Sequence, residues 1–233
     1  VDVVSFLFSL AMLARMGAVP PPPGAEAPSV ARLVEGFRYA WSRQELVGTY
    51  VVDMVAMFFG MPLALFPAIA AHLGGARVLG LLYAAPAVGS LLVSATSGWT
   101  SRVSRHGLGV LFAAAGWGLA IIAFGFARSV PLALLMLAVA GGADMLSGLF
   151  RGAIWNQTIP DQLRGRLAGI EFVSFTSGPA LGSVESGVVA GLFSVQASVV
   201  SGGVLCVGGV ALLAAILPRF RRYDRLAAGA QAG

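Results

Sequence analysis

Lysine is absent from this sequence of 233 residues, and charged residues of any kind make up only 11% of it. Apolar residues account for 58%. A soluble domain of this size needs a much more polar surface than this composition can provide, so we predict that a lipid bilayer surrounds most of the protein.

Cysteine and histidine are also scarce. Cys206 is the only cysteine, which excludes an intramolecular disulfide, a CxxC redox motif and a thiolate metal cage. The two histidines, His72 and His106, are predicted to lie on opposite sides of the membrane, where they cannot share a metal ion. The sequence has no HExxH, GxSxG or phosphate-binding loop, and the segment 141–144 has alanine where the GxGD motif of intramembrane aspartyl proteases has its second glycine. We therefore expect no metal, no cofactor and no enzymatic activity.

Six stretches of the sequence are long and apolar enough to cross a bilayer, since a spanning helix needs roughly 20 mostly apolar residues. The connections between them are short, as expected for antiparallel neighbours. We predict an all-α polytopic membrane protein with six complete transmembrane helices at residues 46–71, 78–97, 108–127, 132–153, 167–192 and 198–217.

These predicted spans divide the chain into four segments. Residues 1–16 are apolar but too short to span, and we expect them to be the remnant of a helix that starts earlier. Residues 17–45, which include four consecutive prolines, are predicted to form a polar linker on one membrane face. Residues 46–217 form the six-helix unit, and residues 218–233 form a tail.

The fifteen basic residues are all arginines, and they are distributed unevenly between the two ends of the predicted spans. Thirteen fall on one side, where Arg151 is counted with the loop after its span, and only Arg77 and Arg128 fall on the other. This asymmetry predicts that the linker, the loops around Arg102 and Arg164 and the C-terminus are cytoplasmic. The arginines lie in short clusters rather than along one stripe, which favours anchoring to an anionic membrane over binding nucleic acid.

Four acidic residues fall within the predicted spans: Asp53, Asp144, Glu171 and Glu185. An ionisable group in a span is costly unless it faces a partner or water, so these are candidate functional residues. Because no basic residue is expected inside the spans to neutralise it, a buried acid must be protonated part of the time, as proton coupling requires. We assign Asp53, Asp144 and Glu185 to substrate or proton coupling and expect Glu171 to pair with an arginine at the cytoplasmic edge. A structural hydrogen bond to a neighbouring helix is the alternative for Asp53 and Asp144.

Methionines and phenylalanines surround Asp53, and they form either an adaptable wall for a bulky substrate or ordinary packing. Pro62 and Pro67 predict a bend in the same span. Small residues at four-residue spacing, including Gly178, Gly182 and Ser186, predict a close helix contact, with a moving gate as the alternative to simple packing.

Two short segments resemble turns of the major facilitator superfamily. The segment 98–107, with Gly98, Arg102 and Arg105, is similar to the second copy of its signature loop, with Arg102 where the more familiar form has an acid. The segment 159–166, which ends in Arg164, Gly165 and Arg166, is similar to the PxxxRGR turn before the eleventh helix. The resemblance assigns these residues and Glu171 to a cytoplasmic gating motif.

The segment 53–67 and its lead-in at residues 35–39 resemble the seventh helix of the enterobactin-exporter branch of this superfamily. The resemblance implies the C-terminal half of a twelve-helix secondary exporter, with a three-plus-three inverted repeat, in the bacterial inner (plasma) membrane. It further implies proton-coupled export of a siderophore or similar hydrophobic small molecule, with the missing N-terminal half as partner. The alternative is a half-size or truncated membrane protein that transports nothing and acts only with a partner half.

Overall fold

The computed structural model describes residues 2–16 and 30–224, including the side chains of all of these except residues 2 and 30–33. All regular structure in these residues is helical, which confirms the predicted all-α class. The elements are α1 (Asp2–Arg15), α2 (Val30–Ser42), α3 (Gln44–Phe59), η1 (Leu63–Leu65), α4 (Phe66–Leu73), α5 (Ala76–Thr96), η2 (Ser97–Arg102), α6 (His106–Gly125), α7 (Val130–Thr158), α8 (Asp161–Leu192), α9 (Val195–Ile216) and α10 (Pro218–Arg221).

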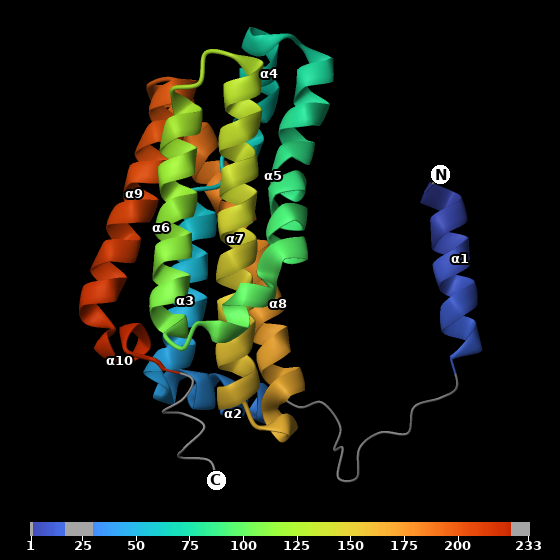
Figure 1. Ribbon diagram of the computed structural model, residues 1–233, viewed down its shortest axis with the longest axis vertical. Coiled ribbons are helices and arrows are strands. Elements are labelled where there is room, and N and C mark those ends of the chain that lie inside the picture. Colours follow the sequence, from blue (N-terminus) through green and yellow to red (C-terminus); the bar gives the residue numbers. More distant parts are fainter. Residues whose placement is uncertain (1, 17–29, 225–233) are drawn as a thin grey trace.

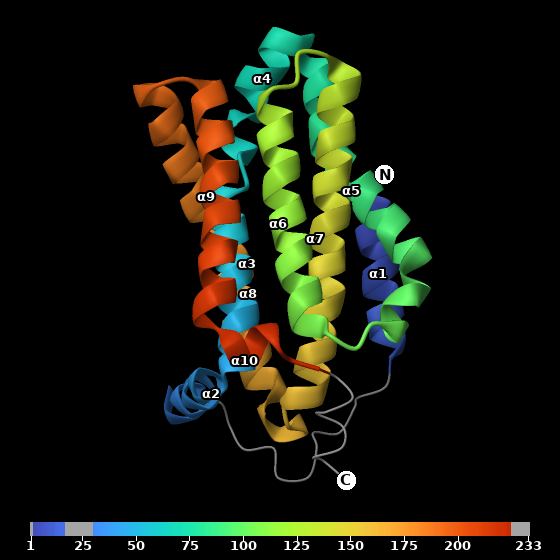
Figure 2. The same ribbon diagram turned by 60° about the vertical axis from the view of Figure 1, so that its left-hand side comes forward.

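The long helices from α3 to α9 run side by side and form a bundle (Figures 1 and 2). α7 packs against both α5 and α6, α9 packs against α6, and α3 contacts α8 and α9. The α5–α6 connection, the α7–α8 turn, α2 and α10 lie at one end, which we call the basic end because it carries Arg102, Arg105, Arg164 and Arg166. α4 and the α6–α7 and α8–α9 connections lie at the opposite end (Figure 1).

Five helical stretches of the described chain are long and apolar enough to cross a membrane: Gln44–Leu73, Ala76–Arg102, His106–Gly125, Val130–Thr158 and Val195–Ile216. They match five of the six predicted spans: every stretch begins a few residues earlier than predicted, three also end later, and His106–Gly125 and Val195–Ile216 end slightly earlier. The sixth prediction corresponds to α8, which has 32 residues and lies in the bundle but is less apolar than the other five. Serines, glycines and two glutamates account for its lower hydropathy.

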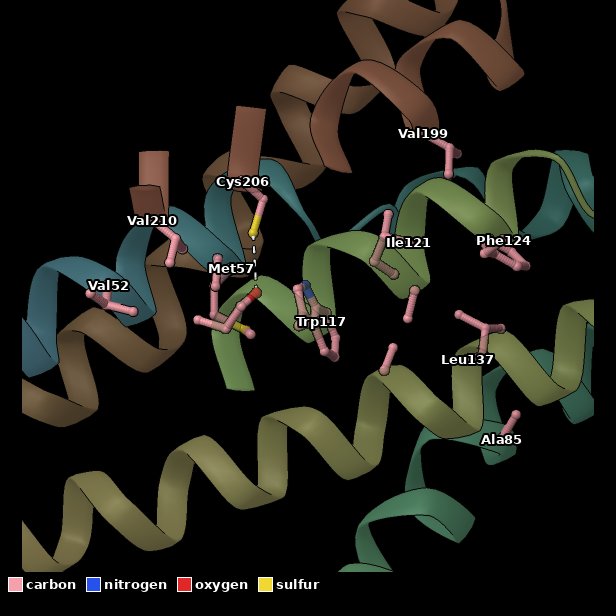
Figure 3. Close-up of a cluster of buried hydrophobic side chains, with 14 of the residues drawn as sticks. Val52, Met57, Ala85, Trp117, Ile121, Phe124, Leu137, Val199, Cys206 and Val210 are labelled. Atoms are coloured by element: carbon pink, nitrogen blue, oxygen red, sulfur yellow. Dashed lines mark hydrogen bonds between the residues drawn. The ribbon is translucent and has the colours of Figure 1, made fainter. Parts of the chain in front are cut away.

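The core of the bundle lies where α3, α6, α7 and α9 meet (Figure 3). Trp117, Ile121 and Phe124 of α6 lie in this core, together with Phe66, Phe150 and Phe220. Cys206 is fully buried there, and its thiol lies 3.8 Å from the Ala114 carbonyl oxygen. Many large apolar side chains on the outside are exposed instead, as expected where lipid replaces water as the solvent.

The first predicted span is interrupted near its middle. α3 ends at Phe59, and regular α-helix resumes only at Phe66, after Pro62 and the short element η1. The Trp117 indole N–H donates a 3.0 Å hydrogen bond to the Gly60 carbonyl, which the break removes from the helix. The bend predicted from the prolines is therefore a true interruption of the helix. The Gly60 carbonyl that the interruption frees accepts its hydrogen bond from α6.

Within the predicted linker, residues 30–42 form the helix α2, which the sequence analysis read only as a polar segment. Ala40 is buried against α3 and α8, whereas Val34, Phe37 and Trp41 are exposed. Phe37 and Trp41 stack with ring centroids 5.5 Å apart. The part of the linker at residues 17–29, and residues 225–233 of the predicted tail, lie outside the described residues.

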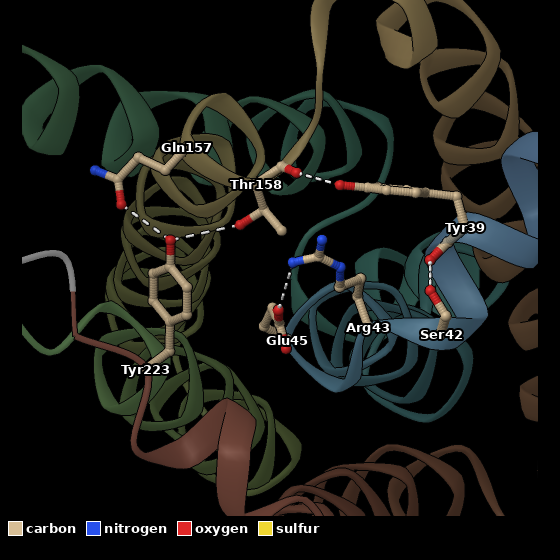
Figure 4. Close-up of polar contacts among 7 residues, drawn as sticks. All are labelled: Tyr39, Ser42, Arg43, Glu45, Gln157, Thr158 and Tyr223. Carbon is tan, nitrogen blue, oxygen red and sulfur yellow. Dashed lines mark hydrogen bonds and ion pairs between the residues drawn. The ribbon is translucent and has the colours of Figure 1, made fainter. Parts of the chain in front are cut away.

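Polar contacts hold α2, α7 and the C-terminal segment together at the basic end (Figure 4). The Tyr39 hydroxyl donates to the Thr158 carbonyl at 2.7 Å. The Tyr223 hydroxyl donates to the Gln157 side chain at 3.0 Å and lies 3.4 Å from the Thr158 hydroxyl. Burial raises the pKa of Tyr223, the Thr158 hydroxyl partly offsets this, and the nearby Glu45 carboxylate adds to it.

Candidate functional site

Asp53 and Asp144, two of the acids expected inside the spans, lie on either side of Arg151. Asp53 is on α3, and Asp144 and Arg151 are on α7. The expectation that no basic residue lies within the spans was wrong. α7 continues to Thr158, about two turns beyond Arg151, so this arginine lies inside the helix rather than at a cytoplasmic loop.

Arg151 forms a buried ion pair with Asp53. One guanidinium nitrogen, Nη1, lies 2.6 Å from Asp53 Oδ1, and the two side chains are only 11% and 9% exposed. The other terminal nitrogen, Nη2, lies 3.9 Å from Asp144 Oδ1, and the Asp144 side chain is 39% exposed. Arg151 Nε is buried and has no hydrogen-bond partner in the part of the chain that the structure describes. The guanidinium is therefore held tightly by one acid and loosely by the other.

A second layer of contacts, one helical turn away, fixes the positions of the pair. Trp155 follows Arg151 by four residues on α7, and Thr49 precedes Asp53 by four residues on α3, so each shares a helix face with its neighbour. The Trp155 indole N–H donates to Thr49 Oγ1 at 2.8 Å, and Thr49 donates to the Leu46 carbonyl at 2.7 Å. The Arg151 guanidinium also lies 6.0 Å from the centre of the Trp155 ring.

Glu171 of α8 joins this group electrostatically, since its charge interacts with both Arg151 and Asp53. Glu171 is thus within electrostatic range of the buried arginine. Three carboxyl groups and one guanidinium carry a charge of −2 when all are ionised. Binding of a proton or a cationic ligand reduces this charge, which gives the cluster a simple means of responding to either.

Glu185, the fourth predicted acid, does not belong to the cluster. It lies on α8 about 21 Å beyond Glu171, at about 1.5 Å per residue. Its side chain is partly exposed. Nothing in the geometry connects it with Asp53 or Asp144.

Asp144 also borders a cavity of about 120 Å³ beside the break in the first span. Met61 and Phe66 from the break, Trp117 from α6 and Ser90 from α5 are among its lining residues. The Ser90 hydroxyl donates to the Gly141 carbonyl at 2.8 Å. The site is therefore mostly apolar and aromatic with one carboxyl group at its edge, a composition typical of sites for amphipathic small molecules.

The glycine pair before Asp144 has a packing function. A Cβ atom on Gly141 would meet the Pro86 backbone of α5, and one on Gly142 would lie 3.1 Å from Val93. Gly89 of α5 likewise leaves no room for a Cβ against the Ala138 carbonyl. These glycines bring α5 and α7 close together, which gives the glycines of the segment 141–144 a packing role.

Apart from Glu171, the predicted gating residues lie at the basic end, away from the buried cluster. Gly98 and Arg102 are in η2, and Arg105 directly precedes α6. Arg164 pairs with Asp161 at 3.0 Å, one turn into α8. Arg166 reaches the linker helix and pairs with Glu35 at 2.6 Å. Gly165 has open space where a Cβ would be, so packing does not require glycine there.

The predicted row of small residues on α8 faces two different neighbours. A Cβ on Gly178 would lie 3.1 Å from Met57 Cβ, and one on Gly182 would meet the carbonyl oxygens of Met57 and Phe58. Ser186 instead accepts, through its backbone carbonyl, a 2.9 Å hydrogen bond from Ser198 of α9. Gly178 and Gly182 thus set the distance between α8 and α3, the helix that carries Asp53.

The two histidines lie at opposite ends of the bundle, His72 on α4 and His106 at the start of α6 (Figure 2). Within the described residues, no group of three or more His, Cys, Asp or Glu side chains is arranged to hold a metal ion.

Comparison with known proteins gives matches over nearly the whole chain. It is 29% identical over 218 residues to Enterobactin exporter EntS of Citrobacter koseri, and 28% identical over the same length to Enterobactin exporter EntS of Escherichia coli O81 and of Shigella boydii serotype 18. Each match covers 92% of this chain and 52% of the relative. No protein-family model matches the chain, and no solved structure matches it.

These matches confirm the resemblance to the enterobactin-exporter branch that the sequence motifs predicted. The chain spans about half the length of the curated relatives it matches. Its apolar helices and its similarity to exporters agree with a membrane protein of the major facilitator type.

Proposed function

We propose that this chain is the C-terminal half of a proton-coupled exporter of the major facilitator type, which expels a siderophore or a similar hydrophobic small molecule. The similarity to enterobactin exporters supports the class of transporter and substrate. The coverage of about half of each relative supports the view that an N-terminal half completes the transport cavity.

The observation that carries the coupling proposal is the pairing of Arg151 with Asp53 inside the bundle. A buried ion pair is a costly arrangement, and one well suited to a site that changes its charge during a cycle. Asp144 provides a second carboxylate within 3.9 Å of the same guanidinium and borders the cavity. Protonation of Asp53 would weaken its hold on Arg151 and allow the guanidinium to move toward Asp144.

This exchange would link proton binding on α3 to the charge that a substrate meets at the cavity. With Arg151 against Asp144, the cavity edge is neutralised, and with Arg151 against Asp53 it carries a free carboxylate. The interrupted span beside the cavity gives α3 and α4 a place to bend between the two states. The residues of the gating motif would then control opening at the basic end.

The test is an efflux assay on the complete natural polypeptide, whose extent is established first by mapping the 5′ end of the transcript. Export of a labelled siderophore from cells or vesicles is measured with and without an imposed pH gradient. We expect Asp53→Asn and Arg151→Gln to abolish the response to the gradient, while Glu185→Gln, outside the cluster, keeps it. Export by Asp53→Asn at the wild-type rate and with the wild-type pH dependence would remove Asp53 from the mechanism.

We also propose that the basic end faces the cytoplasm of a bacterial cell, with the protein in the inner membrane. Because Cys206 is fully buried, it should react little with a thiol reagent, and single cysteines introduced at exposed positions can be labelled selectively. Arg102→Cys should react with a membrane-impermeant maleimide only after the cells are opened, whereas Arg128→Cys should react in intact spheroplasts. The reverse pattern would invert the topology.

The competing proposal is a half-size membrane protein that exports nothing on its own. The same coverage of about half of each relative is compatible with it. A transcript that encodes about six further spans upstream supports the exporter, whereas a transcript that starts at Val1 supports the half-size protein. In the second case, the purified chain would have to be tested for self-association and for a separate partner half.

A further inference from the structure

A second cavity lies at the basic end, away from the buried charge cluster. Its volume is about 430 Å³, and its lining residues are Arg105, Leu108, Arg221, Arg222 and Asp224. Three guanidinium groups and one carboxylate give this lining a charge of +2. None of the roles assigned to the site at Asp53 and Arg151 uses this cavity.

The two arginines of the C-terminal segment are held in place by the residues beside them. Phe220 is fully buried. Gly48 of α3 and Gly107 of α6 leave the space it occupies, since a Cβ on either would collide with it. The Arg219 backbone N–H donates to the Gln44 side chain at 2.7 Å. The backbone that carries Arg221 and Arg222 is therefore fixed against α6 before any ligand arrives.

The start of α6 adds to the positive potential of the cavity. Arg105 is the residue before this helix, its side chain makes no capping hydrogen bond, and the first turn contains no acidic residue. The partial positive charge at the helix N-terminus is thus left to act together with the three guanidinium groups.

An apolar strip leads away from the cavity along the outside of α6. Leu108 lines the cavity, and Phe112, one turn further on the same face, is 74% exposed. Leu119 continues the strip and is also exposed. On the neighbouring helix α9, which leads into α10, Leu212 and Ile216 are exposed as well.

We propose that this cavity binds the phosphate group of an anionic phospholipid whose acyl chains lie along the strip of Leu108, Phe112 and Leu119. Basic pockets between membrane helices are suited to phospholipid headgroups because the guanidinium groups pair with phosphate oxygens. The strip favours a lipid over a free phosphate, since only a lipid contacts both the arginines and the exposed apolar side chains. Arg105 then has a binding function in addition to the gating role that the sequence suggested.

The experiment is a lipid titration of the purified full chain in detergent, followed by native mass spectrometry. The probes are phosphatidylglycerol, phosphatidylcholine with the same acyl chains, and inorganic phosphate. We compare the wild type with the triple variant Arg105→Gln, Arg221→Gln, Arg222→Gln. The matched control is Arg77→Gln, Arg128→Gln, which removes arginines at the opposite end.

The wild type and the control should retain phosphatidylglycerol in preference to phosphatidylcholine, and the triple variant should bind it at least about tenfold more weakly. Phe112→Asn, at an exposed position outside the buried core, should weaken it several-fold. An equal loss in the control, wild-type affinity in the triple variant or unchanged affinity in Phe112→Asn would each overturn the proposal. Binding of inorganic phosphate as tight as that of phosphatidylglycerol would overturn the lipid assignment and identify free phosphate as the ligand.

Discussion

Replacing Arg151 by glutamine is the sharpest perturbation of the buried pair. It leaves the carboxylate of Asp53 without its partner at a position where the side chain is 9% exposed. Removal of one partner from a buried ion pair typically costs about 3–5 kcal/mol. The loss of the contact with the Trp155 ring adds about 1 kcal/mol, and uptake of a proton by Asp53 relieves part of the total. We therefore expect Arg151→Gln to lower the free energy of unfolding by about 3 kcal/mol.

The reciprocal change, Asp53→Asn, should cost less. Arg151 has a second carboxylate within reach, because Asp144 lies 3.9 Å from its guanidinium, whereas no other ion pair involves Asp53 among the described residues. The double variant Asp53→Asn, Arg151→Gln should be more stable than Arg151→Gln alone, because the buried carboxylate at position 53 that would lack its partner is then absent.

Unfolding of the purified chain in mixed detergent micelles, followed by circular dichroism, measures all four members of this cycle. Two results would refute the reasoning. One is a change of less than about 0.5 kcal/mol in Arg151→Gln, and the other is full additivity of the two single changes. Either would mean that the pair contributes nothing as a pair.

Three further perturbations test separate parts of the structure. Trp117→Phe removes the hydrogen bond to the Gly60 carbonyl at the helix break and should lower the free energy of unfolding by about 1–3 kcal/mol in the same assay. Its control, Trp99→Phe at an exposed position, should lower it by less than about 0.5 kcal/mol. Gly182→Ala places a methyl group against the carbonyl oxygens of α3 and should destabilise the folded protein by about 1–3 kcal/mol. Gly187→Ala, where the space is open, should be neutral or slightly stabilising. Equal effects of the two changes would contradict the close contact between α8 and α3. The pKa of Tyr223 is raised in the folded protein chiefly by burial, so its contribution to stability is complete below about pH 10 and is lost as pH rises through the folded pKa. The wild type should thus lose more stability than Tyr223→Phe when alkaline pH is scanned, and parallel curves would exclude this contribution.

The sequence predicted the helical class and most span positions because long apolar runs are stable only in the lipid bilayer, where they cross as helices. It also located the bend near Pro62, since proline removes a backbone donor wherever it occurs. The lengths of the spans were less accurate, because helices continue past the apolar run into the polar ends of the bundle, as α7 does to Thr158.

That extension is the reason why Arg151 was misjudged. A positive residue near the end of an apolar run is usually interpreted as part of a loop at the membrane surface. Local sequence does not show which neighbouring helix will pack over it. A signal was nevertheless present, since Arg151 follows Asp144 by seven residues and precedes Trp155 by four, which places all three on one face of a helix. Its pairing with Asp53, 98 positions away, depends on the packing of α3 against α7 and could not be read from local spacing.

The function of the pair can be separated from its contribution to folding by replacing both members with apolar residues. Buried ion pairs replaced in this way by side chains of similar volume often leave stability unchanged or higher by about 1–4 kcal/mol, because the cost of desolvating two charges disappears. We therefore expect Asp53→Leu, Arg151→Met to unfold no more easily than the wild type and yet to lose export driven by a pH gradient. If this variant instead exports normally, the pair is only a packing device and proton coupling must reside elsewhere. If it fails to fold while the polar double variant folds, the layer of Thr49 and Trp155 requires polar, hydrogen-bonding neighbours for its geometry, and the two positions then have a structural role that does not depend on charge.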